Sequence, residues 1–182
     1  MLLQLPQKMA HALLDLLYPR LCLSCGKQLS AAPRGLCVSC RLRLPVSDHF
    51  YSPENSFTER FWGRLPLEAG FAFLQFSKGG MVQGLLHQFK YQGKKELGEE
   101  LGKLFGYRLK EEKLVPDIAG IVPVPLHPKK RRKRGYNQSE WLAKGLGEAL
   151  EVPVLSRQSF KFFNQKHEHK RRHCWVGKNI GE

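Results

Sequence analysis

The stretch CLSCGKQLSAAPRGLCVSC, residues 22–40, contains two Cys-x-x-Cys pairs separated by 11 residues. The first pair is Cys22 with Cys25 and the second is Cys37 with Cys40. Each pair can offer two thiolates from one tight turn, and two pairs complete a tetrahedral set of zinc ligands. Because four protein ligands leave no open position, the pattern predicts a structural rather than a catalytic zinc ion. The alternative interpretations are two redox-active pairs and a chance clustering of cysteines.

The segment before the cysteines has apolar residues at helical spacing, namely Met9, Leu13, Leu16 and Leu17. This pattern predicts an amphipathic docking helix. Nowhere do about 18 apolar residues run together, so no membrane span is predicted. The odd cysteine count, with Cys174 expected as a free thiol, favours a reducing compartment, and we expect a cytoplasmic protein.

Changes in composition predict three parts in the chain. Residues 1–44 form the helix and the zinc module, and residues 45–60, which are polar and contain two prolines, are interpreted as a linker. Residues 61–182 are expected to form an α/β domain that is incomplete at its C-terminal end. Its last 27 residues are rich in Lys, Arg and His without periodicity.

The pattern of the third part predicts strands and helices in alternation. Strands are expected at 71–76, 118–124 and 152–155, and a helix at 137–150 with Asn137 as its N-cap. Apolar residues at helical spacing predict two further helices, with the faces Val82, Leu85, Leu86, Phe89 and Leu97, Leu101, Leu104, Phe105. Strand, loop, helix and strand over 118–155 form a βαβ unit, which predicts a parallel sheet.

The chain is strongly basic, with 30 Lys and Arg against 16 Asp and Glu and a net charge of +14. Six of these cations follow one another at 129–134, in an expected loop between a strand end and the helix that begins near Asn137. A strand end, a cationic loop and a helix N-terminus together predict a phosphate or pyrophosphate site. The alternatives are a solvated charge run and a general nucleic-acid patch.

Three segments, in order, resemble the ComF family of phosphoribosyltransferase-like proteins, which is associated with bacterial competence and DNA uptake. They are LHQFKYQGKKEL at 86–97, VPVPLHP at 122–128 and RGYNQS at 134–139, and they follow a four-cysteine module as in that family. The resemblance implies a small zinc knuckle module followed by a type I phosphoribosyltransferase-like parallel sheet. It also implies binding of phosphoribosyl pyrophosphate (PRPP), with Mg²⁺ if the domain is complete.

Carried over by position, the resemblance implies a short pyrophosphate loop with residues beside it that shape the site. These residues are Pro123, Val124, Pro125, Leu126, His127, Arg132, Arg134, Gly135, Tyr136, Asn137 and Gln138. Lys90 lies in the family's basic helix and has no assigned role. The family's second loop, two acids followed by a Thr- and Gly-rich turn, has no counterpart here, so the chain is predicted to be truncated and inactive as a transferase.

Two further functions remain open on the sequence. One is a zinc-containing module that binds single-stranded DNA or proteins of the competence machinery, which the charge and the cysteine module favour. The other is a truncated fragment without a function of its own, because an open sheet without its last strands exposes unpaired edges.

Overall fold

The computed structural model describes residues 19–29, 35–64, 68–114, 118–155 and 173–177. Its chain divides into two compact units, Met1–Arg43 and Leu44–Glu182. The amphipathic helix predicted before the cysteines lies outside the described residues. Within the described part, no helix is both long and apolar enough to cross a lipid bilayer.

The first unit is small and has a short hairpin followed by helix α2, Val38–Leu42. Leu21 and Gln28 form an antiparallel bridge across the hairpin. The interior of this unit contains Cys22, Leu36 and Cys40, which are 3%, 0% and 0% exposed. Because two of these three buried side chains are cysteines, little apolar surface is buried to stabilise the fold. A unit this small then needs a cross-link through its cysteine sulfur atoms.

The stretch 45–60, predicted as a linker, is folded into the second unit. It carries the 3₁₀ helix η1, Asp48–Tyr51, and the helix α3, Ser56–Glu59. Asn55 caps α3 by accepting from the N–H groups of Phe57 and Thr58, and its amide also donates to the carbonyl of Gly70. The linker interpretation is therefore wrong, because the side chains of Asn55 and Thr58 bind this stretch to the backbone of Gly70.

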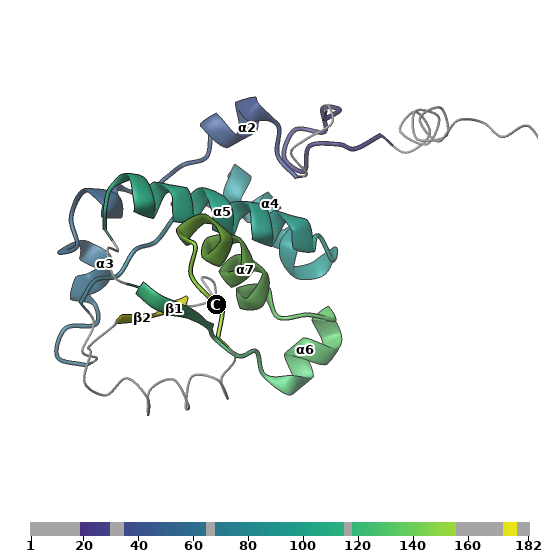
Figure 1. Cartoon of the computed structure of the whole chain (residues 1–182). Helices are drawn as coiled ribbons and strands as arrows, with labels where there is room; N and C mark the ends of the chain where they lie inside the picture. The colour runs from purple at the N-terminus through teal and green to yellow at the C-terminus, as the bar shows by residue number, and fades with distance from the viewer. Residues whose placement is uncertain (1–18, 30–34, 65–67, 115–117, 156–172, 178–182) are drawn as a thin grey trace, which may run out of the picture. The chain divides into compact units, whose positions relative to one another are not determined.

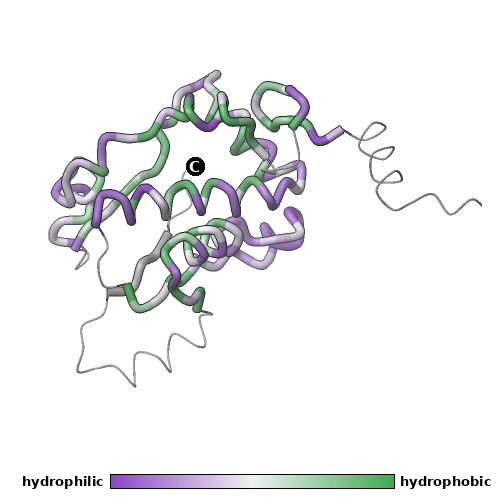
Figure 2. The backbone as a smooth tube through the Cα atoms, turned by 45° about the horizontal axis from the view of Figure 1, so that its top comes forward, coloured by the Kyte–Doolittle hydropathy of each residue, from purple (hydrophilic) through white to green (hydrophobic). Residues whose placement is uncertain are grey.

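Helices α4, Met81–Tyr91, α5, Lys95–Glu111, and α7, Gln138–Leu150, form most of the second unit (Figure 1). Their residues alternate between hydrophilic and hydrophobic character along the chain (Figure 2), as expected of helices with one buried face. The buried apolar residues of α4 and α5 are Val82, Leu85, Phe89, Leu97, Leu101 and Leu109. The sequence predicted both faces, although Leu86, Leu104 and Phe105 are only partly buried.

Helices α5 and α7 are neighbours (Figure 1), and glycines lie where they make contact. A Cβ atom built on Gly102 would lie 2.2 Å from the carbonyl oxygen of Leu142, and one built on Gly145 would lie 1.9 Å from that of Glu99. Both distances are shorter than atoms tolerate, so the two backbones meet where only glycine fits. Ion pairs border this contact, with Lys144 Nζ at 2.9 Å from a Glu99 carboxylate oxygen.

The strand predicted at 118–124 is β1, Ile118–Pro123, and it pairs in parallel with β2, His173–Gly177. On its other side β1 meets the segment after α7, where Ile121 N donates to Pro153 O and Leu155 N donates to Ile121 O. The strands predicted at 71–76 and 152–155 are only single bridges, Val46 with Leu74 and Ile121 with Val154. The wider phosphoribosyltransferase-like sheet is not present among the described residues.

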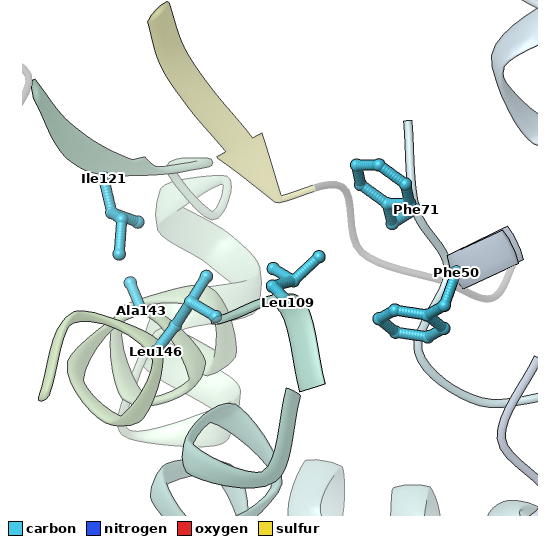
Figure 3. Packing of buried hydrophobic residues seen from close by; sticks show 6 residues of the cluster. All are labelled: Phe50, Phe71, Leu109, Ile121, Ala143 and Leu146. Carbon is cyan, nitrogen blue, oxygen red and sulfur yellow. The ribbon is translucent and has the colours of Figure 1, made fainter. Parts of the chain in front are cut away.

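A core cluster of the second unit joins η1, the segment at Phe71, α5, β1 and α7 (Figure 3). Its buried members are Phe50, Phe71, Leu109, Ile121, Ala143 and Leu146. Phe50 stacks on Phe71 with ring centroids 6.1 Å apart, and it forms a T-shaped pair with Phe105 at a centroid distance of 5.8 Å. The stretch interpreted as a linker thus supplies Phe50, one of the two buried phenylalanines of this core.

Candidate metal centre and basic surface

The first Cys-x-x-Cys pair lies in the turn of the hairpin. Cys22 N donates to Lys27 O at 2.8 Å, and Gly26 N donates back to Cys22 O at 2.9 Å. Gly26 has a φ of 71°, in the left-handed region that favours glycine. This backbone reversal brings the side chains of Cys22 and Cys25 to the same side of the turn.

The second pair is positioned by the start of α2. Cys37 is the N-cap residue of this helix, and its carbonyl accepts from Arg41 N at 3.0 Å. Cys40 lies one turn later and is fully buried. The N–H of Cys37 donates to Cys22 Sγ at 3.3 Å, which links the helix start to the hairpin.

The four sulfur atoms have the spacing of a tetrahedral zinc site. All four Sγ atoms lie within 4.8 Å of one another, and those of Cys25 and Cys37 are 3.7 Å apart. A zinc–sulfur bond of about 2.3 Å places the sulfurs of a tetrahedron about 3.8 Å apart. The four cysteines are free of disulfides, so the donor set and its geometry fit a structural zinc ion.

The pKa values of the thiols show why the cluster needs a cation. Burial would raise the pKa of Cys22, but backbone N–H donors, chiefly that of Cys25, lower it to about 6. A hydrogen bond from the Ser24 side chain lowers the pKa of Cys40. The backbone at Lys27 lowers the pKa of Cys25, yet burial and the neighbouring thiols raise it to about 11. Four adjacent thiolates repel one another, and a bound divalent cation offsets this repulsion with its positive charge.

The six cations expected in a loop form the helix α6, Pro128–Arg134. Pro128 occupies the first turn, where its missing N–H costs no hydrogen bond. His127 Nδ1 accepts from Lys129 N at 3.3 Å, and Gly135 ends the helix with a φ of 77°. Side chains 129–133 are exposed. The prediction of a loop is therefore wrong, because Pro128 and the His127 cap start a separate short helix before the one that Asn137 caps.

Asn137 is the N-cap of the next helix, α7, as the sequence predicted, and its side chain accepts from Ser139 N at 3.3 Å. Its amide also donates to the carbonyl of Val124 at 3.0 Å, and the Ser139 hydroxyl donates to that same carbonyl. These bonds hold the segment that follows β1 against the beginning of α7. Asn137 therefore has a structural role in addition to any contact with a ligand.

We expect Asn137→Ala to destabilise the second unit by about 1–2 kcal/mol, since it removes a helix cap and leaves the Val124 carbonyl with fewer donors. Asn137→Asp retains the cap acceptor but not the amide donor, so it should lose less. Urea unfolding monitored by circular dichroism measures both variants. Equal losses for the two would show that the cap itself contributes nothing.

The remaining predicted phosphate-site residues differ in exposure. Tyr136 and Gln138 are buried, at 5% and 2%, whereas Pro125, His127 and Arg132 face solvent. Val124 and Leu126 are partly buried, and Lys90 is partly buried on α4. Their role in binding a phosphate stays a prediction.

The structure also brings together side chains that the sequence did not connect. Lys95 Nζ lies over two rings, 5.5 Å from the centroid of Tyr136 and 5.7 Å from that of Trp141. Arg134 lies over the ring of Tyr91, 5.7 Å from its centroid. The segments 86–97 and 134–139 are thus adjacent in space. No helical or strand periodicity points to these contacts, since they join separate elements.

Residues 13–50 match the model of a double zinc ribbon domain. The chain is also similar to Competence protein F of Haemophilus influenzae, with 25% identity over 144 residues that cover 74% of this chain and 62% of that protein. The chain thus spans less than two thirds of the length of this relative. No solved structure matches.

Proposed function

We infer that this chain, a ComF-family protein with an N-terminal zinc module, is a competence-associated protein that binds a phosphate-bearing ligand through helix α6. The observation that carries the proposal is the charge of this helix. Residues 129–134 are all Lys or Arg, and α6 contains no acidic residue. In this proposal the zinc module stabilises and docks, since its four ligands leave no position for chemistry.

An exposed ion pair joins α6 to α7. Arg131 lies 3.9 Å from a Glu140 carboxylate oxygen, and both side chains are largely exposed, at 62% and 45%. Exposed pairs of this kind contribute little free energy. A row of six cations attracts phosphates and releases their counterions on binding, which favours a nucleic-acid strand over a single small anion.

PRPP is the second candidate ligand, and the position of α6 favours it. The helix directly follows the C-terminal end of β1, the edge at which ligands bind in open α/β folds. A Mg²⁺ ion with PRPP is part of this proposal, as the family resemblance implies. Pyrophosphate release from PRPP above a buffer control would support this ligand and would contradict the predicted lack of transferase activity.

The charge proposal predicts that reversing two cations of α6 weakens binding of a labelled oligothymidylate. In a plot of the logarithm of the binding constant against the logarithm of the salt concentration, each phosphate contact with a single strand contributes about 0.7 to the slope. The double variant Arg132→Glu, Lys133→Glu should lose two such contacts, so we expect its slope to be shallower by about 1.4. Fluorescence anisotropy at several salt concentrations measures this slope.

The matched control for this experiment is Arg64→Glu with Lys78→Glu. Both residues are exposed and lie outside α6, so the pair changes the net charge equally. We expect the control to retain the slope of the unmodified protein. An equal reduction in both double variants would assign binding to net charge and would refute a specific role of α6.

A further inference from the structure

Two exposed rings lie one helical turn apart on α4. Tyr91, the last residue of the helix, is 59% exposed, and His87 is exposed as well. Their ring centroids are 5.1 Å apart, with an interplanar angle of 46°. Aromatic side chains usually become buried because they carry a large apolar surface. A pair of rings on the solvent side of a helix therefore indicates an interaction surface.

A guanidinium group completes this surface. The Cζ atom of Arg134 lies 5.7 Å from the Tyr91 ring centroid, over the ring. The Nη1 atom of Arg134 donates to Gln138 Oε1 at 3.0 Å, and Gln138 is 2% exposed. A buried amide on α7 thus orients the arginine, so that its planar group keeps a fixed position beside the ring.

The position of Arg134 joins the rings to the cations of α6. Arg134 is the last residue of that helix, so the aromatic surface is continuous with the proposed phosphate-binding surface. A nucleotide carries both a phosphate, which α6 could bind, and a flat base, which could stack on Tyr91. Proteins that bind single strands combine these two elements, a cationic track and exposed rings on which bases stack.

We propose that His87, Tyr91 and Arg134 form a stacking platform for a nucleobase whose phosphates lie on α6. This inference rests on the proposed function, and it narrows the ligand from any phosphate to one that carries a base. The base can belong to a free nucleotide or to a single strand, and both offer the same ring and phosphate. An exposed tyrosine without a ligand needs none of its neighbours here. The combination of a second ring, an oriented guanidinium and adjacent cations therefore favours a ligand site.

The test compares two labelled oligonucleotides of equal length, an oligothymidylate and an abasic strand with the same backbone. The zinc-loaded full chain is used with Tyr91→Ala, Tyr91→Trp and the control Tyr107→Ala. Tyr107 is matched in residue type and exposure, at 56%, and lies on α5. Thymidine monophosphate as a competitor distinguishes a free nucleotide from a strand.

We expect Tyr91→Ala to weaken oligothymidylate binding at least about fivefold, the range for one base–aromatic stack. Binding of the abasic strand should be unchanged, and Tyr91→Trp and Tyr107→Ala should bind as the unmodified protein does. If all proteins bind both strands equally, the phosphate proposal holds and the platform is refuted. If neither strand and no mononucleotide binds, the platform and the nucleic-acid form of the proposed function are both refuted, and PRPP is left as the candidate ligand.

Discussion

Replacing Gly145 by alanine is expected to destabilise the second unit by about 2 kcal/mol or more, the cost of overpacking a tightly filled contact. The added Cβ would lie 1.9 Å from the carbonyl oxygen of Glu99 and 2.9 Å from the backbone nitrogen of Lys103. Both neighbours are main-chain atoms of α5, so no side-chain rotation can relieve the clash. The two helices must separate, which also loosens the packing of Ala143 and Leu146 in the core.

The direction of this effect opposes helix propensity, which makes the experiment informative. Alanine in place of glycine within an exposed helix usually stabilises by about 0.5–1 kcal/mol. Gly84 on α4 provides that control, because it is exposed and a Cβ built there meets nothing within 4 Å. Gly84→Ala should therefore raise the urea midpoint, while Gly145→Ala should lower it.

Urea unfolding measured by tryptophan fluorescence can follow both variants, since Trp141 lies on α7 itself. The slope of the transition should be unchanged if both variants unfold from the same native structure. A midpoint for Gly145→Ala at or above that of the unmodified protein would show that α5 and α7 do not meet as closely as described.

Much of this contact could have been predicted from the sequence. Gly98, Gly102 and Gly106 recur every four residues, which places them on one face of α5. The apolar residues Leu97 and Leu101 drew the prediction of a core face instead. Apolar periodicity locates a helix and its buried side, but it does not show which partner approaches closely enough to require glycine.

The stretch 45–60 and helix α6 show a different limit of sequence reasoning. Both are polar or charged, and local composition predicts a linker and a loop for such stretches. The structure buries Phe50 and Thr58, at 2% each, because contacts with residues 69–73 supply partners that lie far along the chain. Helix α6 has caps at both ends, His127 and Gly135, and composition alone does not reveal them among six like charges.

The cysteine centre was predictable because its chemistry needs only spacing. Two Cys-x-x-Cys pairs specify four thiolates and two turns, and the structure places all four sulfurs within 4.8 Å. The surface around Tyr91 was not predictable in this way. It depends on His87 of α4 and Arg134 of α6, and the contact of Arg134 with Tyr91 brings these two helices together there.

Removing zinc is expected to unfold the first unit and to leave the second folded. Structural zinc contributes about 10–16 kcal/mol of apparent binding free energy in zinc-finger peptides, and small metal-dependent modules unfold without it. Leu36 is the one apolar non-cysteine side chain among the residues buried before Arg43 in the described part of the chain. The core of the second unit contains no residue of the first, so the loss should be local.

The variant Cys40→Ser tests whether the first unit depends on zinc, because it replaces only one sulfur atom by oxygen. Cys40 is fully buried, and a hydroxyl oxygen is a poor replacement for a thiolate ligand. We expect zinc content to fall from about one ion per chain to well below one, the stoichiometry of a four-cysteine site. Cys174→Ser is the control, since it leaves the four-cysteine set intact and should keep the metal.

Hydrogen–deuterium exchange locates the effect along the chain. In the chelated protein and in Cys40→Ser, amides of residues 19–29 and 35–43 should exchange rapidly, whereas those of α5 and α7 should stay protected. Acidification should release the metal as well, because protons compete for the thiolates. Protected amides in the first unit of the metal-free chain would show that its fold does not depend on zinc, and rapid exchange in α5 would show that the two units unfold together.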